Sequence, residues 1–263
     1  MASDGDGAVA APSASPNLSK AFAAGKVQGA VDAEGSEVCE ACVAFSSEHY
    51  PNGLNANFFD GSEAEVVESH IKKFENPESR DIAKAVPDIM KVLKEEVGLT
   101  KRSVIADMGA GTGLFLNVLS EEAKSVFAVE ISPHFQEYLR KQVKVRRLQN
   151  VTVVAGTALD PCLPPASVDV VFLCDVYHHI EYPKTVCKRL LESLRPGGRL
   201  VVIDFIRDEA VHKSHPPGWI LQHVRAGQEV FRAEIESVGF RLVSEPAVPS
   251  LAENYFMIFA PPL

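Results

Sequence analysis

Five short apolar runs alternate with helical stretches through the middle of the chain, and this alternation limits the fold more than any other feature. The runs cover residues 103–107, 125–130, 151–154, 168–173 and 199–204. Each run is almost continuously apolar, which is typical of strands buried on both faces of a parallel sheet. Helices between the runs then cover those faces, so the pattern predicts a doubly wound α/β fold.

Further elements flank this alternation. Two more strands are predicted at residues 240–243 and 255–259, and the short segment between them favours an antiparallel pair at a sheet edge. Helical spacing of apolar residues predicts helices at 62–74, 78–97, 133–145 and 183–194. One further helical stretch is predicted between Pro217 and Val238, with Gly239 as its C-terminal cap.

Composition narrows the possible partners. The chain has 263 residues, and its 35 acidic against 26 basic side chains give a net charge of −9, which disfavours nucleic acid as a partner. No apolar run has the length of a membrane span, and no secretory signal begins the chain. Five cysteines, an odd number, are typical of free thiols, so we expect a cytoplasmic protein.

A glycine-rich loop follows the first predicted strand. It reads Asp107-Met108-Gly109-Ala110-Gly111-Thr112-Gly113 and leads into a helix. Glycines allow a tight turn and a close approach to a ligand, and the helix N-terminus presents free N–H groups. The spacing differs from the dinucleotide fingerprint because Leu114 stands where its third glycine would be. Asp107 would repel a phosphate, whereas it favours a sulfonium cofactor that carries an amino group.

The second predicted strand ends in Glu130, 21 residues beyond Gly109. An acid at this place can accept hydrogen bonds from both hydroxyls of a ribose. A solvated strand end is the alternative interpretation. The glycine-rich loop upstream favours the ribose-binding interpretation.

These segments together resemble a known family. Residues 104–113 resemble motif I of the class I S-adenosylmethionine-dependent methyltransferases, residues 128–132 resemble motif II, and residues 194–200 resemble the Leu-x-Pro-Gly-Gly turn before the fifth strand. The resemblance covers about residues 75–260. It implies a Rossmann-like, seven-stranded sheet whose last strand is antiparallel, with S-adenosylmethionine bound across the carboxyl ends of the strands.

The resemblance also implies which residues bind the cofactor. The loop residues that cradle its methionine part and ribose are Gly109, Ala110, Gly111 and Gly113. Asp107 is then near the amino group, Glu130 holds the ribose, and Ile131 packs on the adenine. Other expected contacts follow the third and fourth strands, at Thr157, Ala158, Cys174 and Asp175. Thr157 replaces the acid that commonly meets the adenine amine in this family.

The resemblance also divides the chain. Residues 1–35, rich in Ala, Ser, Gly and Asp, are predicted to be a disordered tail. Residues 36–98 combine an irregular segment with two helices, and we expect them to close over the cofactor as a lid. Residues 99–263 form the methyltransferase core. The sequence does not indicate an oligomeric state.

Catalytic candidates follow the fourth strand. His178 and His179 lie at the expected active-site end, and an imidazole suits base catalysis near neutral pH. Tyr177 is a candidate for the pocket wall, although packing is the alternative role for all three. Arg225 could pair with an acidic acceptor, and a place on a solvated helix face is the preferred interpretation.

No metal site is expected from the sequence. The later histidines His212, His215 and His223 lack regular ligand spacing. Cys39 and Cys42 form only half of a zinc motif, and coincidental spacing is the preferred interpretation.

The leading hypothesis is methyl transfer to the oxygen, nitrogen or sulfur of a small-molecule acceptor. The main alternative is a catalytically inactive methyltransferase-fold protein that serves as a partner or regulatory subunit. Arsenite, protein or RNA methylation ranks lower, because the cysteines are not placed as in arsenite methyltransferases and the chain is acidic.

Overall fold

A computed structural model of the chain describes residues 55–77, 80–212 and 215–262. The predicted disordered tail, most of the irregular segment after it and the Cys39–Cys42 pair lie outside the described residues. In the described part, no helix combines the length and the apolar character needed to cross a membrane.

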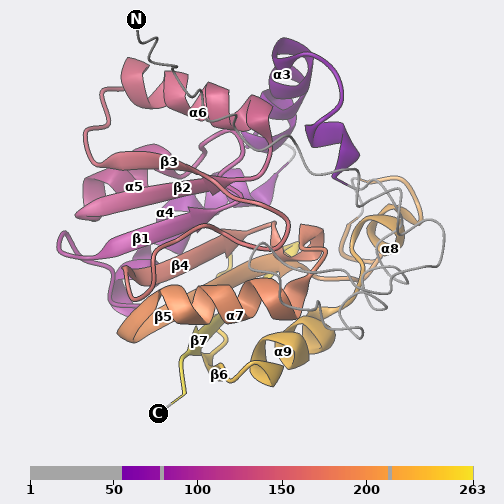
Figure 1. Cartoon of the computed structure of the whole chain (residues 1–263). Helices are drawn as coiled ribbons and strands as arrows, with labels where there is room; N and C mark the ends of the chain where they lie inside the picture. The colour runs from indigo at the N-terminus through magenta and orange to yellow at the C-terminus, as the bar shows by residue number, and fades with distance from the viewer. Residues whose placement is uncertain (1–54, 78–79, 213–214, 263) are drawn as a thin grey trace, which may run out of the picture.

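The seven predicted strands form one mixed sheet (Figure 1), which confirms the fold expected from the sequence. The strands are β1 (Val104–Met108), β2 (Ser125–Glu130), β3 (Val151–Ala155), β4 (Val168–Cys174), β5 (Leu194–Phe205), β6 (Arg241–Ser244) and β7 (Asn254–Ala260). Their order in the sheet is β3-β2-β1-β4-β5-β7-β6. The first five strands run parallel, and β7 lies antiparallel between β5 and β6. The carboxyl ends of β1 to β5 therefore meet at one edge.

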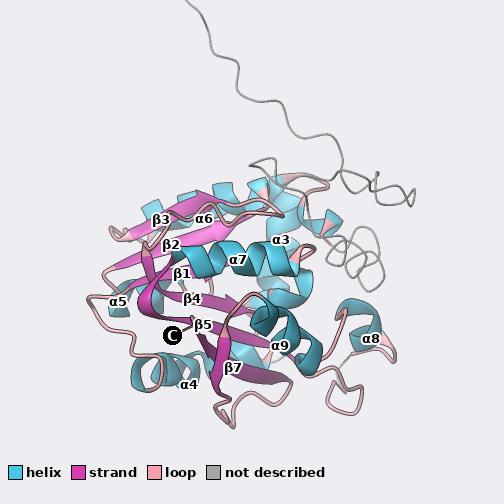
Figure 2. Ribbon diagram, turned by 60° about the horizontal axis from the view of Figure 1, so that its bottom comes forward, coloured by secondary structure: helices cyan, strands magenta, loops and turns pink. Residues whose placement is uncertain are grey.

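Helices cover both faces of the sheet. The α-helices are α3 (Glu63–Phe74), α4 (Asp81–Glu95), α5 (Leu116–Glu122), α6 (Pro133–Val145), α7 (Pro183–Ser193), α8 (Trp219–His223) and α9 (Gln228–Ser237). Two 3₁₀ turns, η1 (Ala56–Phe58) and η2 (Tyr177–His179), lie before α3 and after β4. Figure 2 shows α7 on one side of the central strands and α4 on the other.

Successive residues of the central strands enter two different apolar cores. Ile105 of β1 packs in the core that contains α4, α5 and Leu139 of α6, whereas its neighbour Ala106 packs in the core that contains α7, α8 and α9. Both residues are fully buried. This arrangement explains why the strands read as continuous apolar runs without alternation of apolar and polar residues.

Side-chain caps fix two helix starts where the sequence predicts them. Ser62 and Glu65 form a capping box at the start of α3, with each side chain bonded to the backbone N–H of the other residue. Ser132 caps α6, and Pro133 occupies the first position of that helix, where its missing N–H costs no hydrogen bond. The helix bounds here agree with the prediction to within one residue.

The predicted single helix before Gly239 is wrong, because α8 and α9 are separate. Val224 and Gly227 adopt extended backbone conformations and break the helix between them. The break turns Arg225 inward, where it is 3% exposed and forms two hydrogen bonds of 2.7 and 2.8 Å to Glu234. Its guanidinium also lies over the Phe231 ring at 4.5 Å. The interpretation of Arg225 as part of a solvated face is therefore wrong as well.

The Arg225–Glu234 pair gives the first prediction. Replacing Glu234 with Ala leaves a buried guanidinium without its carboxylate, so we expect a loss of about 3–5 kcal/mol in the free energy of unfolding. Glu236→Ala on the same helix removes a half-exposed ion pair with Arg232 and a long, 3.4 Å hydrogen bond from the Leu242 N–H, and it should cost about 1 kcal/mol. Denaturant unfolding measures both values, and equal losses in the two variants would contradict the assigned role.

Candidate active site

A cavity of about 430 Å³ opens at the carboxyl edge of the sheet. Strands β1, β4 and β5 contribute Asp107, Cys174 and Phe205 to its wall. The segment before the core contributes further wall residues, among them Phe58, His70, Phe74 and Arg80, and α8 contributes Trp219 and His223. The cavity therefore lies where an open α/β sheet is expected to bind its ligand, between strand ends and a covering segment.

The glycine-rich loop forms the floor of the cavity. Gly109 and Gly111 have φ angles of +67° and +51°, which side chains rarely tolerate. A Cβ atom at Gly109 would lie 2.6 Å from a methyl group of Val176, whereas one at Gly111 would meet nothing closer than 3.8 Å. Gly109 therefore lets the loop pack against the residues after β4, and Gly111 leaves its backbone open to the cavity.

Glu130 fixes this loop from the neighbouring strand. Its carboxylate accepts hydrogen bonds from the N–H groups of Gly111 at 3.0 Å, Ile131 at 2.8 Å and Ser132 at 2.9 Å. Burial raises the pKa of Glu130, and the three N–H donors oppose that rise. The carboxylate thus holds the end of β2 and the loop in one arrangement.

Asp107, the first residue of the glycine-rich loop, is a buried acid on the cavity wall. It is 4% exposed, and burial together with the neighbouring charge of Glu130 raises its pKa to about 7. Such an acid gains a charge near neutral pH and is stabilised in its charged form by a cation brought into the cavity.

Arg80 is a cavity residue that the sequence reasoning missed. It precedes α4, pairs with Asp175, and lies over the rings of Phe74 and Phe205, both at 5.5 Å. Its Nε atom is buried and has no hydrogen-bond partner among the described residues. Burial raises the pKa of Asp175 to about 7 although Arg80 opposes the rise, and Asn254 donates a hydrogen bond to the same carboxyl group.

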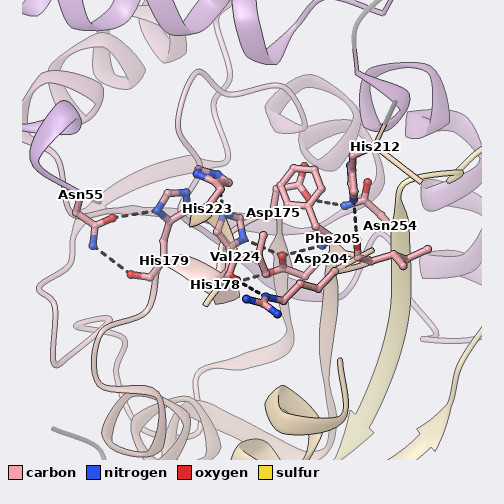
Figure 3. A network of polar contacts seen from close by, with 12 residues as sticks. Asn55, Asp175, His178, His179, Asp204, Phe205, His212, His223, Val224 and Asn254 are labelled. Atoms are coloured by element: carbon pink, nitrogen blue, oxygen red, sulfur yellow. Dashed lines mark hydrogen bonds and ion pairs between the residues drawn. The ribbon is translucent and has the colours of Figure 1, made fainter. Parts of the chain in front are cut away.

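Three histidines gather at the other end of the cavity. Figure 3 shows His178, His179 and His223 together, with Asn55 and Asp204 on their flanks. The Nδ1 atom of His178 lies 2.7 Å from Asp204, and its Nε2 atom lies 3.3 Å from Nε2 of His223. Burial lowers the pKa of His178 and of His223 to about 3, so both rings are neutral at physiological pH.

Tyr177 does not belong to this group, which corrects the prediction that it faces the pocket. It is fully buried, its hydroxyl lies 3.5 Å from Sγ of Cys187, and its ring packs against Phe231. Of the three residues of the short turn η2, His178 and His179 line the cavity and Tyr177 does not.

The predicted cofactor residues fall into two groups. Those on the cavity wall are Asp107, Gly109, Ala110, Gly111, Cys174 and Asp175. Those outside it are Gly113, Glu130, Ile131, Thr157 and Ala158. Gly113 packs against side chains of α5 and α6, and the Thr157 hydroxyl accepts a hydrogen bond from the Asp160 N–H within a turn. The roles of all these residues in cofactor binding stay predictions.

The cysteines do not assemble a thiolate site in the part of the chain that the structure describes. Cys187 is buried in a core, Cys162 is exposed, and Cys174 lines the cavity. No group of three potential metal ligands among the described residues includes a cysteine. These positions give no support to arsenite as the acceptor.

Comparison with known proteins finds a family match within the predicted core of the chain. Residues 106–202 match the family model described as "Methyltransferase domain". This match and the fold support the resemblance to class I S-adenosylmethionine-dependent methyltransferases over this part of the chain. The chain is 29% identical over 120 residues to an uncharacterized methyltransferase-like protein of Schizosaccharomyces pombe, and the aligned part covers 45% of this chain and 44% of the relative.

Two more comparisons show a partial sequence match and a similar fold. An uncharacterized methyltransferase of Mycobacterium bovis is 32% identical over 116 residues, covering 44% of this chain and 43% of the relative. The matched part of the chain thus spans less than half the length of these curated relatives. In fold the chain resembles a SAM-dependent methyltransferase of Aquifex aeolicus, with a TM-score of 0.62, 21% identity, and coverage of 76% of this chain and 98% of that one.

The packing of Gly109 against Val176 yields the second prediction. Gly109→Ala adds both a strained φ and a steric overlap, whereas Gly197→Ala adds only the strained φ, because its Cβ would meet nothing within 4 Å. We expect Gly197→Ala to cost about 1 kcal/mol of unfolding free energy and Gly109→Ala about 1–3 kcal/mol more.

Val176→Ala serves as the control in this series. It removes the methyl groups that the new Cβ would meet, so the double variant should recover part of the Gly109→Ala loss in denaturant unfolding. Strictly additive losses in the double variant would show that the two side chains do not compete for the same space.

Proposed function

We propose that this chain transfers a methyl group from S-adenosylmethionine to the oxygen, nitrogen or sulfur of a small-molecule acceptor. One observation carries the proposal. A single cavity joins a glycine-rich, acidic end at β1 to a neutral, imidazole-lined end at η2 and α8. The first end suits the cofactor, and the second suits a neutral or proton-losing acceptor.

The acidic end fits the cofactor's amino acid part. Asp107 is a buried carboxyl group on the cavity wall and would pair with the ammonium group of the cofactor. Arg80 has a buried Nε–H without a partner among the described residues, and it would donate to the cofactor's carboxylate. The open space beside Gly111 would admit a flat ligand close to the loop. Glu130 would add the ribose contact from β2. S-adenosylmethionine supplies an electrophilic methyl group on a sulfonium.

The imidazole end fits the acceptor. His178, His179 and His223 share the wall with the aromatic rings of Phe205 and Trp219, so an acceptor meets apolar surface and a few polar atoms. We assign His178 and His179 the catalytic part, which is to hold the acceptor's reacting atom and manage the proton that it loses. The buried carboxylate of Asp204 keeps His178 in one orientation.

Calorimetric titration with S-adenosylmethionine tests the cofactor half of this proposal. The full chain should bind one equivalent, and Asp107→Asn should weaken binding at least about tenfold because an ammonium loses its charged partner. Asp88→Asn, a change at an exposed acid of α4, is the matched control and should leave affinity unchanged. Absence of binding in the unaltered chain would contradict the proposal.

Transfer of a labelled methyl group tests the other half. Panels of thiols, phenols and amines should include a class that the chain methylates, and His178→Ala should abolish that transfer while cofactor binding persists. Binding of the cofactor with no transfer to any class would favour the inactive regulatory protein.

The affinity for the cofactor should depend on pH through Asp107. With a pKa of about 7, this carboxyl group is mostly protonated at pH 6 and mostly charged at pH 8, and the charged form binds the ammonium. Affinity should therefore rise with pH across this interval in calorimetry. Asp107→Asn should flatten the profile, and an unchanged slope in that variant would assign the titration to another group.

The predicted lid gives a further test. Phe58, His70 and Phe74 belong to the segment before the core and line the cavity. Removing residues 1–35 should leave cofactor affinity unchanged, whereas removing residues 36–75 should weaken it because one wall of the cavity is lost. Circular dichroism checks that each shortened chain is folded, and equal affinities would refute the lid.

A further inference from the structure

We propose that His178, His179 and His223 form a site for a divalent first-row transition metal, with zinc as the favoured ion, at the acceptor end of the cavity. Each residue offers one ring nitrogen, and these nitrogens all lie within 4.8 Å of one another. All three side chains also line the cavity. This site has no local signal in the sequence, because its ligands come from η2 and α8, and His179 and His223 are 44 residues apart.

The spacing of one pair of ring nitrogens matches the geometry of a metal site. The Nε2 atoms of His178 and His223 lie 3.3 Å apart. Two nitrogens bound to one tetrahedral Zn²⁺, each about 2.0–2.1 Å from it, are about 3.4 Å apart. A metal ion thus fits between these atoms with little change in ring position.

Hydrogen bonds outside the cluster orient His178 as a ligand. Both oxygens of Asp204 accept backbone N–H groups, from Phe205 at 2.8 Å and His178 at 3.0 Å, so the carboxylate is fixed. Nδ1 of His178 donates to this carboxylate, which leaves the lone pair on Nε2, toward His223. A carboxylate behind a metal-binding histidine is the usual arrangement in zinc proteins.

The same reasoning applies to His179. The Nδ2 atom of Asn55 donates to the carbonyl of His179 at 3.1 Å and to the carboxylate of Glu181 at 3.2 Å. This leaves Oδ1 of Asn55 as the acceptor 3.1 Å from Nδ1 of His179. The lone pair of His179 is then on Nε2. His223 is held by stacking on Trp219, with ring centroids 4.7 Å apart.

A second group of potential ligands lies nearby, at His212, His215 and Glu253. Only His215 of this group lines the cavity, whereas all three residues of the first group do. We therefore assign the metal to the first group. Three protein ligands with a fourth position facing a cavity are typical of catalytic zinc.

The role of the ion rests on the proposed function. The thiol or hydroxyl of an acceptor would bind at the open position of the metal ion. It would then lose its proton to solvent more readily, because the metal ion stabilises the resulting thiolate or alkoxide. A lone pair of this sulfur or oxygen would form a bond to the methyl carbon of S-adenosylmethionine. The bond between that carbon and the sulfonium sulfur would break at the same time, and S-adenosylhomocysteine, a neutral thioether, would leave. In this arrangement the histidines act as ligands, and thiols and phenols are the expected acceptor classes.

Titration of the tag-free, chelator-treated full chain with Co²⁺ tests the site without any cofactor or acceptor. We expect one equivalent to give the visible absorption of tetrahedral cobalt, and Zn²⁺ to displace it. His223→Ala, with His223→Gln as a second variant, should weaken binding more than about 100-fold, and Asp204→Asn about 10–100-fold. His134→Ala, outside the cluster, is the control and should bind as the unaltered chain does.

Three outcomes would overturn the site: no cobalt uptake by the folded chain, uptake unchanged in His223→Ala and His223→Gln, or uptake lost in His212→Ala. The first would show that a hydrogen bond between two neutral imidazoles accounts for the His178–His223 contact. Calorimetry with S-adenosylmethionine on the same samples separates this failure from failure of the proposed function, because cofactor binding does not require the histidines.

Discussion

The burial of the central strands on both faces determines where this chain can place polar chemistry. Neighbouring residues such as Ile105 and Ala106 face two different cores, so a charged side chain within the strand would be buried among apolar groups. The buried acids of these strands therefore lie at or near the carboxyl ends, at Asp107, Glu130 and Asp204, whereas the half-buried Asp169 lies at the amino end of β4. Parallel pairing brings those ends to one edge, and the cavity lies there.

Collecting buried acids at one edge costs stability, and the chain offsets this cost with specific partners. Glu130 receives three backbone N–H groups, Asp204 receives two and the His178 ring, and Asp175 pairs with Arg80. Asp107 has the least compensation, since only burial and a like charge act on its pKa. A cofactor ammonium is the partner that would complete it.

The sheet could be predicted from the sequence because helices cover both faces of a parallel sheet. Its strands are therefore buried on both sides and appear in the sequence as continuous apolar runs. The sequence also predicted the loop from Asp107 to Gly113, since a loop of this kind is contiguous along the chain. Asp204 ends an apolar run as Asp107 and Glu130 do, and this signal could have identified it.

Other features depend on tertiary contacts and have no local signal. Arg80 reaches the cavity from a segment before the core, and Arg225 turns inward only because α8 and α9 are separate helices. His223 joins His178 and His179 through the placement of α8. Tyr177 and His178 are adjacent in sequence, yet only one of them faces the cavity, because the direction of each side chain is set by η2.

A crystal structure with S-adenosylhomocysteine tests the central claim most directly, since it locates both halves of the cavity at once. The account predicts that the ligand's amino group lies beside Asp107, its carboxylate beside Arg80, and its sulfur toward His178 and His223. A ligand bound elsewhere, or one whose sulfur faces away from the histidines, would contradict the account.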